Sequence, residues 1–594
     1  MKMYVFLGIM AMLFSTTLCA DAQQDYLARF QTFQAYSQNL PTTPDDAFIS
    51  FINQDKPLSI KLREKWLYQL AKKQNWAEFS QYYKPSNDLS LSCYSEIAAF
   101  NQGLQQQALN AAKSLWLNPK SMPEPCNDLF SILKKQGALT DGLIIQRIAL
   151  ALKERNLSLA RYLTKQFPIA RPAEEQLLMR VNQNPNYIAQ LTPGPLHQSL
   201  YLFGLKRLVS INMDTALKLY QKALQRGFLD EAHQQAFLAH VALYKAMRGQ
   251  EDAPVWFNKV KPAYYNDVLI DWQIRFALKK RLWKQVERLT SLPQYKEDPC
   301  WQYWQARALE AQGQSEKAKA IYQQLAQKRQ YYGFMASLRL NKKPSFENET
   351  VTTNLSLLKP YQVILDKVKS DYQSKQDGQA SHLLNDFISE LPKNEQSALA
   401  FWVASTLDWH VKSIYLSNND ILNNQLSLRF PLTHQSDIDN FAKAYHIPKE
   451  YIYAIIRQES SFKQDVISFA GAYGLMQIMP RTASLITRHS HISYRDKKEL
   501  FQPAKNIQIG VAYLNVLAKQ FKRHPILIAA AYNAGPHMAS YWLRNHSITD
   551  VDIWIETIPW QETRNYLKNV MAFYTVYQFR LNNHADVKAN LQKL

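Results

Sequence analysis

Glycine is scarce in this sequence, with 15 residues in a chain of 594. Glycine supplies the positive φ angles of tight turns, so its scarcity argues against a turn-rich β architecture. Alanine, leucine, glutamine and lysine are abundant instead, and they favour helix. A chain of this length exceeds what one hydrophobic core supports. We therefore expect a mainly α protein of two to four domains.

Long apolar runs are also missing, and no later stretch suffices for a transmembrane helix. The first residues nevertheless have the pattern of an export signal, with Lys2, an uncharged apolar stretch at 3–14 and the small residues of Ala20-Asp21-Ala22. That stretch is too short for a membrane anchor. We expect cleavage after Ala22, a signal peptide over residues 1–22, and a periplasmic protein. A lipoprotein site at Cys19 is the alternative.

Cysteine is the third scarce residue, with four in the chain. Removal of the signal leaves Cys93, Cys126 and Cys300 in an oxidising compartment, where two of them can pair. Cys93 and Cys126 lie in one segment and form the favoured pair; closing that loop would contribute roughly 3 to 4 kcal/mol. Three buried free thiols are the alternative. The spacing does not resemble a metal site, no His/Asp cluster has ligand spacing, and we expect no metal.

Positive charge is in excess, with a formal net charge of +21. Such a surface favours an anionic partner. Nucleic acid is one candidate. Peptidoglycan, whose stem peptides carry carboxylates, is the other. The export signal favours peptidoglycan and disfavours nucleic acid, because an exported protein rarely meets nucleic acid.

The first part of the chain shows helix after short helix. Residues 214–226 have apolar residues at helical spacing, followed by Gly227 as a stop signal. Residues 301–309 and 315–325 predict a helix pair that alanines allow to pack closely. This pattern is typical of tetratricopeptide-like repeats, which stack into a solenoid. We therefore predict a helical superstructure domain over residues 23–354.

A second region follows the polar stretch Asn341 to Asn354, which predicts a linker. Helical patterning resumes in residues 359–391 and 397–408, and a further loop leads to Arg429. We predict a helical linker domain over residues 355–428. The remaining residues, 429–594, contain the chemistry.

Glu459 is the first candidate catalytic residue. Ile452, Ile455 and Ile456 mark the apolar stripe of a helix, and Glu459 occupies the next position of that stripe. Burial and the negative end of a helix both raise the pKa of a carboxyl group, as a general acid requires. A solvent-exposed Glu459, or one paired with Arg457 or Lys463, is the alternative.

Three further segments bear on the chemistry. Residues 471–474 form a glycine turn that leads into 475–480, and residues 525–532 predict a short buried helix that ends in Tyr532-Asn533-Ala534-Gly535-Pro536. Glu556 to Arg564 precede a long helix that carries Tyr566. Together with Arg457-Gln458-Glu459-Ser460, these motifs closely resemble, in order and spacing, those of the soluble lytic transglycosylases. Trp301 to Trp304 and the Cys93–Cys126 pair also resemble the large periplasmic type.

This resemblance implies a ring-like helical superstructure, a small linker domain and a C-terminal lysozyme-like domain. It implies cleavage of the β-1,4 bond between N-acetylmuramic acid and N-acetylglucosamine, with a 1,6-anhydro end as product. Glu459 alone would act as acid and then as base, assisted by the N-acetyl group of the substrate. No cofactor is expected, the chain is expected to act as a monomer, and a ring would favour exolytic cleavage.

The resemblance also implies substrate-binding residues, matched by position. They are Ser468, Gln477, Met479, Tyr532 and Glu562. Core packing for Met479 and a helix-start charge for Glu562 are the alternatives. Tyr473 and His537 depart from the family pattern, where a small residue and glycine are usual.

Three rival functions remain. A muramidase that hydrolyses the same bond would need a second carboxylate facing Glu459, and Glu562 or Glu556 could supply it. A peptidoglycan-binding helical scaffold with an inactive domain would lack a working Glu459. A nucleic-acid binder conflicts with the export signal.

Overall fold

The computed structural model describes residue 26 and residues 28–545, 550–582 and 584–590. Every regular element in this part of the chain is a helix, apart from two isolated β-bridges. The mainly α fold class is confirmed. None of these helices combines the length and the apolar character that a membrane span needs. The predicted signal peptide, residues 1–22, lies outside the described residues.

Contacts within the chain define two compact units. One contains the residues up to Lys245 together with Asp252–Tyr265, and the other contains Ala246–Glu251 and Asn266 onward. The domain boundaries expected after residues 354 and 428 fall inside the second unit and stay predictions.

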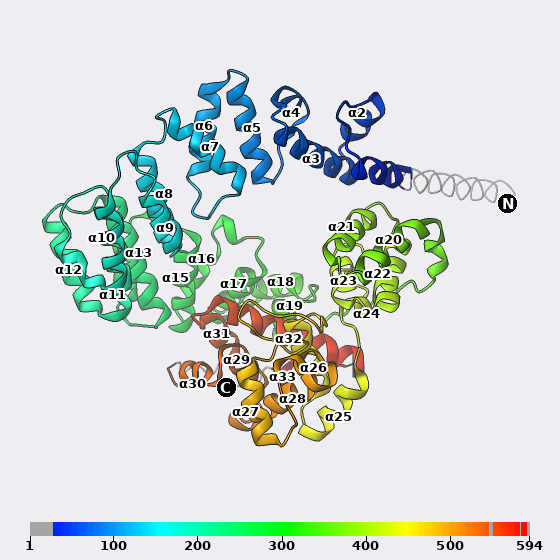
Figure 1. Ribbon diagram of the computed structural model, residues 1–594. Helices are drawn as coiled ribbons and strands as arrows, with labels where there is room; N and C mark the ends of the chain where they lie inside the picture. Colours follow the sequence, from blue (N-terminus) through cyan, green and yellow to red (C-terminus); the bar gives the residue numbers. More distant parts are fainter. Residues whose placement is uncertain (1–25, 27, 546–549, 583, 591–594) are drawn as a thin grey trace. The chain divides into compact units, whose positions relative to one another are not determined.

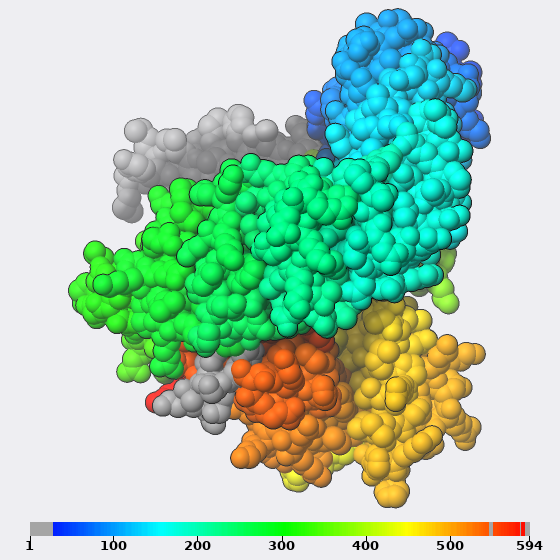
Figure 2. Space-filling model, turned by 90° about the vertical axis from the view of Figure 1, so that its left-hand side faces the viewer, coloured from blue at the N-terminus to red at the C-terminus, as the bar shows by residue number. Residues whose placement is uncertain are grey.

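The first unit is a succession of short helices, most of which pack on a neighbour in sequence. Figure 2 shows this order as a surface whose colour passes gradually from blue to green. The helices are α2 (Asp46–Ile52), α3 (Pro57–Lys72), α4 (Trp76–Tyr82), α5 (Leu89–Asn101), α6 (Gln105–Trp116), α7 (Glu124–Lys135), α8 (Asp141–Lys153), α9 (Leu157–Thr164), α10 (Pro172–Gln183), α11 (His197–Ile211), α12 (Met213–Gln225), α13 (Glu231–Met247) and α14 (Ala253–Lys259).

Helix α12 illustrates why the sequence folds this way. The Asn212 side chain accepts a hydrogen bond from the Thr215 amide and caps the first turn. Ala216 and Tyr220 are buried on one face, as the helical spacing predicts. Gly227 then adopts a φ of +58°, which ends the helix.

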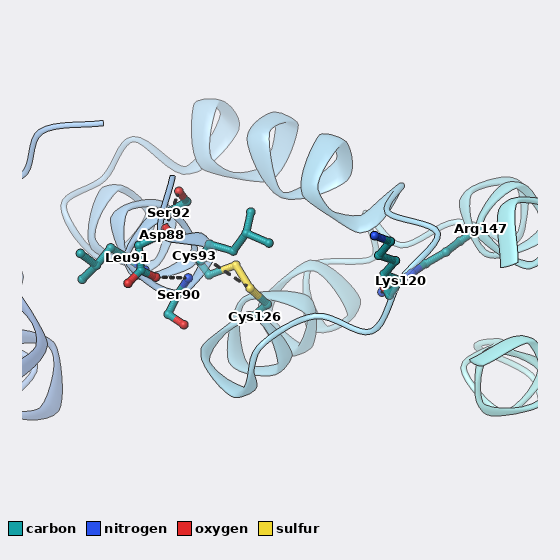
Figure 3. Close-up of a disulfide and its surroundings, with 9 residues drawn as sticks. Asp88, Ser90, Leu91, Ser92, Cys93, Lys120, Cys126 and Arg147 are labelled. Carbon is teal, nitrogen blue, oxygen red and sulfur yellow. Dashed lines mark hydrogen bonds between the residues drawn. A yellow bond between two sulfur atoms is a disulfide. The ribbon is translucent and has the colours of Figure 1, made fainter. Parts of the chain in front are cut away.

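Two fixed points hold α5 to α8 together (Figure 3). Cys93 of α5 and Cys126 of α7 form a disulfide, as predicted, while Cys300 is free. Arg147 of α8 donates hydrogen bonds to the carbonyls of Asn118 and Lys120 at 3.1 and 3.3 Å. The loop between α6 and α7 is thereby tied to the next helix along the chain.

The second unit contains the helix pair predicted around Gly313, which is formed by α17 (Pro299–Ala311) and α18 (Ser315–Leu325). Its helices, labelled in Figure 1, are α15 (Asp267–Lys279), α16 (Trp283–Thr290), α17 (Pro299–Ala311), α18 (Ser315–Leu325), α19 (Tyr331–Arg339), α20 (Gln362–Gln373), α21 (Asp377–Ile388), α22 (Lys393–Leu407), α23 (His410–Leu416), α24 (Leu426–Arg429), α25 (Gln435–Tyr445), α26 (Lys449–Glu459), α27 (Pro480–Ser490), α28 (Pro503–Gln520), α29 (Pro525–Ala534), α30 (Pro536–Asn545), α31 (Val551–Thr557), α32 (Gln561–Asn582) and α33 (Val587–Asn590). Residues 341–354, the expected linker, contain no helix.

The core of the second unit lies around α26 and α32. These two helices pack along each other, and α29 packs against α32 as well. The apolar helix α29 is buried over Ile526 to Ala531. The same core continues into α15 to α19, which contact α31 and α32. The packing of α26 on α32 determines what faces the end of α26.

Candidate active site

Glu459 is the last residue of α26. Ile452, Ile455 and Ile456 are fully buried, as their spacing predicts. Glu459 lies one turn farther on the same stripe and is half-buried. The carboxyl group is therefore at the negative end of a helix and at the edge of a hydrophobic core.

One neutral donor contacts this carboxyl group. The Tyr566 hydroxyl of α32 donates a hydrogen bond of 2.6 Å to Glu459 Oε1. The cations that could have paired with Glu459 are engaged elsewhere. Arg457 Nε donates to the Arg429 carbonyl at 2.9 Å, and Lys463 lies 3.6 Å from Asp377. The ion-pair alternative for Glu459 therefore does not hold.

The electrostatics of Glu459 follow from these neighbours. Burial raises the pKa of Glu459, the hydrogen bond from Tyr566 opposes the rise, and the negative charge of Glu562 adds to it, which gives a pKa of about 7. A carboxyl group with such a pKa exists in both protonation states near neutral pH. It can donate a proton and then accept one.

A rigid turn lies between α26 and α27. Tyr473 forms bridges with Ile467 and Ile478, and Gly474 has a φ of +72°. A Cβ at Gly474 would lie 2.2 Å from the Leu500 carbonyl and 2.4 Å from Asn506 Nδ2. Only glycine fits here, because both the backbone angle and the space exclude a side chain.

Asn506 holds this turn from α28. It is fully buried, donates to the carbonyls of Tyr473 and Leu500 at 2.9 and 2.8 Å, and accepts a 2.8 Å hydrogen bond from the Met476 amide. Sequence reasoning missed Asn506. The available signal was an amide beside the apolar stripe of a helix, which by itself does not indicate a partner.

The residues predicted in this turn occupy different environments. Ser468 Oγ accepts a 3.0 Å hydrogen bond from the Ala472 amide. Gln477 Nε2 donates to the Gly474 carbonyl at 2.8 Å. Met479, at the start of α27, is 39% exposed. Ser468 and Gln477 stabilise the turn, while the exposure of Met479 disfavours core packing as its role.

Tyr532 links α29 to the same turn. Its hydroxyl donates a 2.7 Å hydrogen bond to the Met476 carbonyl. Burial raises the pKa of Tyr532, and the charge of Glu459 raises it further, so the two side chains are close. Next to it, Asn533 Oδ1 accepts a 2.7 Å hydrogen bond from Thr563 of α32.

The motif from Glu556 to Arg564, which leads into α32, is held in place by its own Arg564. This buried side chain donates to the carbonyls of Ile558 and Pro559 at 2.6 and 3.2 Å. Glu562, one turn before Tyr566, is exposed, and its charge acts on Glu459. The structure thus brings Glu459, Tyr532 and Glu562 together. It adds Tyr566, which the motif contained but which was not assigned a role.

Glu556 belongs to a different site. It is fully buried, and its carboxylate contacts Arg275 at 3.1 Å, Lys568 at 2.7 Å and the Tyr332 hydroxyl at 2.6 Å. Cys300 Sγ lies 3.6 Å away. Lys568 and Arg275 hold the pKa of Glu556 far below its usual range. We call these five residues the anchor cluster. Both carboxylate oxygens are engaged, so Glu556 is unsuited to face Glu459 as a second acid.

Tyr473 and His537, the two residues that depart from the family pattern, are not among the residues that contact Glu459. Tyr473 is buried, and its ring packs at 5.3 Å from that of Phe501. His537 is exposed in the first turn of α30. Within the described residues, no group of three or more His, Cys, Asp or Glu side chains is arranged to hold a metal ion.

Comparisons with known proteins agree with this geometry. Residues 437–555 match the transglycosylase SLT domain, and residues 557–585 match the soluble lytic transglycosylase helical domain. The soluble lytic murein transglycosylase of Escherichia coli is 27% identical over 94% of this chain and 88% of its own length. The protein of the same name from Salmonella typhimurium is 28% identical over 93% and 88%.

Solved structures extend the similarity to the fold. An inactive mutant of the lytic transglycosylase Slt from Pseudomonas aeruginosa matches 98% of this chain and 96% of its own, with 28% identity and a TM-score of 0.78. The 70 kDa soluble lytic transglycosylase of Escherichia coli matches 95% and 93%, with 27% identity and a TM-score of 0.70. With the four motifs gathered around Glu459, the chain carries a transglycosylase SLT domain and is similar over nearly its whole length to the soluble lytic transglycosylases.

Proposed function

We propose that this lytic transglycosylase cleaves the β-1,4 bond between N-acetylmuramic acid and N-acetylglucosamine with Glu459 as its single acid and base. One observation carries the proposal. Glu459 is a half-buried carboxyl group with a neutral hydroxyl donor, and its pKa is raised to about 7. General acid catalysis near neutral pH requires such a group.

The first step breaks the glycosidic bond. The protonated Glu459 donates its proton to the bridging oxygen as the bond from that oxygen to C1 breaks. The N-acetyl carbonyl of the muramic acid stabilises the cation at C1, which replaces a second protein carboxylate. The hydrogen bond from Tyr566 stabilises the carboxylate that Glu459 becomes.

The second step closes the product ring. The Glu459 carboxylate removes the proton from the C6 hydroxyl, and O6 bonds to C1 to form the 1,6-anhydro end. Glu459 is protonated again, so the cycle ends as it began and consumes no water. The pKa of about 7 suits both proton transfers.

The neighbouring residues receive proposed roles from their environments. Met479, exposed at the start of α27, and Tyr532, close to Glu459, would line the sugar site. Ser468 and Gln477 would keep the turn beside it in shape. Glu562, exposed near Glu459, would contact the sugar or the stem peptide.

The setting of the reaction forms part of the proposal. The net charge of +21 complements the carboxylates of peptidoglycan stem peptides. The disulfide between Cys93 and Cys126 fits an oxidising compartment, and with the expected export signal it supports a periplasmic enzyme. We further propose that the protein acts as a monomer and cleaves from chain ends.

Mass spectrometry of the muropeptides released from purified sacculi tests the proposal. The parent chain, Glu459→Gln and the control Glu450→Gln, in the first turn of the same helix, are compared. Anhydro-ended products from the parent and the control, with none from Glu459→Gln, are expected. Reducing-end products would indicate a muramidase, and Glu562→Gln would then test the second carboxylate. No products from the parent would favour the binding scaffold.

A further inference from the structure

The first unit contains a cavity that glycan cleavage does not use. It has a volume of about 590 Å³ and lies between α8, α11 and α13, with Leu117 also in its lining. This volume is in the range of sites that hold a small ligand, roughly 300 to 1,000 Å³. All of its lining residues come from positions 117–240, far along the chain from Glu459.

The walls of this cavity are apolar. Leu150 and Leu152 line it from α8, Leu202 and Phe203 from α11, and Ala236 from α13. In a well-packed helical stack such side chains would fill the space between them. Their arrangement here leaves an apolar surface open, which favours a ligand with a hydrocarbon part.

Apart from two histidines, the charged residues that line the cavity are all cations. They are Lys153, Arg155, Lys206 and Arg207. Arg207 is satisfied by the backbone carbonyls of Asn182 and Val181. Among the residues that the structure describes, the charge that acts on Lys206 is that of Lys153, and no acidic group opposes it. No lining residue is acidic, and the one acidic contact on this wall is Asp230, which lies 2.7 Å from the lining residue His233.

The titration behaviour of the cavity agrees with this charge pattern. Burial lowers the pKa of Lys206, and the charge of Lys153 lowers it further. Burial, Lys206 and Arg155 together lower the pKa of His240 to about 4. A cation held half-buried among other cations is unfavourable, and a bound anion would relieve the repulsion.

We propose that this cavity binds an amphiphilic carboxylate of the fatty-acid type. The alkyl chain would occupy the space between α8, α11 and α13, and the carboxylate would pair with Lys206 and Lys153. The apolar walls and the cations without counter-charge carry this assignment, because each matches one half of such a ligand.

One wall of the cavity is held in place by contacts within the protein. Leu117 begins the loop that Arg147 holds through the Asn118 and Lys120 carbonyls (Figure 3). The guanidinium of Arg147 also lies 4.5 Å above the ring of Trp116. A wall held in this way needs little ordering on binding, which favours affinity.

Calorimetric titration of the full chain with dodecanoate, below its micelle-forming concentration, tests the proposal. We expect one saturable site, with binding that weakens roughly threefold for each methylene removed in decanoate and octanoate. Dodecyltrimethylammonium, which has the same chain and the opposite charge, is expected to bind at least about tenfold more weakly.

Variants separate the two halves of the site. Lys206→Gln, which removes the charge, is expected to weaken dodecanoate binding at least about tenfold. The exposed Lys218→Gln on α12 is expected to leave it unchanged. Ala236→Trp, which fills the cavity, is expected to abolish binding, with folding checked by circular dichroism and by muropeptide release. Absent binding to the parent chain, or equal binding by Lys206→Gln and Lys218→Gln, would overturn the proposal without bearing on glycan cleavage.

Discussion

Glu459, which is half-buried, and Glu556, which is fully buried, are two carboxyl groups in the same unit, and their environments are opposite. Glu556 contacts two cations and a tyrosine hydroxyl. Glu459 contacts one tyrosine hydroxyl. The pKa of Glu556 is held far below its usual range, while that of Glu459 is raised to about 7. Burial raises the pKa of both carboxyl groups, and the cations that contact Glu556 reverse that rise.

This contrast separates a structural site from a chemical one. The anchor cluster joins α15, α17 and α19 to α31 and α32 through charges that stay fixed. Nearby, Asp552 of α31 accepts a 2.7 Å hydrogen bond from Tyr303 and pairs with Arg307, which extends the same connection. A carboxyl group so firmly ionised cannot donate a proton near neutral pH, whereas Glu459 can.

Replacement of Glu459 gives the largest expected effect. Glu459→Gln is expected to lower the rate of muropeptide release by about a thousandfold or more, because it removes the proposed proton donor. Release from purified sacculi, followed by chromatography, measures this rate. The raised pKa of Glu459 also affects stability. The contribution of this carboxyl group to folding stability is fully present below pH 4.5, its ordinary pKa, and is lost as the pH rises through about 7. The variant should therefore gain stability relative to the parent as the pH rises through this range. A rate within tenfold of the parent would contradict the assignment.

Replacement of Glu556 is expected to act on stability instead. Glu556→Gln leaves Lys568 without its counter-charge and Arg275 with Asp271 alone, and should lower the free energy of unfolding by about 3 to 5 kcal/mol. Urea denaturation measures this change. The control is Glu316→Gln, whose side chain is 88% exposed and should change stability by less than about 0.5 kcal/mol. Loss of activity with unchanged stability would place Glu556 in the chemistry and break the comparison.

Two glycines of the turn beside Glu459 form a matched pair. Both have positive φ angles, +84° at Gly471 and +72° at Gly474, but a Cβ meets backbone only at Gly474. Gly471→Ala should cost about 1 to 2 kcal/mol of stability through its backbone angle. Gly474→Ala should cost roughly 1 to 3 kcal/mol more and reduce activity, because the turn must move away from the Leu500 carbonyl. Equal losses of thermal stability would show that the turn is not held tightly.

Tyr566 is expected to set the upper pH limit of activity. The acid must be protonated, so kcat/KM should fall as the pH rises through about 7. Tyr566→Phe removes a hydrogen bond that stabilises the carboxylate, so the pKa should rise and the alkaline limb should move upward by about one pH unit. Tyr574→Phe, on the same helix, is the control and should leave the limb in place. A downward shift for Tyr566→Phe would contradict the role given to that hydrogen bond.

Much of the site was open to prediction from the sequence. The stripe of Ile452, Ile455 and Ile456 fixed the face of α26 on which Glu459 lies, because helical periodicity is a local property. The glycine turn and the stop at Gly535 follow from local backbone rules in the same way. Asn506 could not be found, since two of its three hydrogen bonds are to residues 33 and 30 positions away, Tyr473 and Met476.

The sequence by itself determined the helical class, the pairing of Cys93 with Cys126 as the favoured disulfide, and Glu459 as the candidate acid. It left Glu556 and Glu562 equal as second carboxylates. Only the tertiary structure separated them, by placing Arg275 and Lys568 against Glu556 and leaving Glu562 exposed near Glu459. The physical reason is that the charge of a buried group depends on neighbours brought together by packing, which local periodicity does not encode.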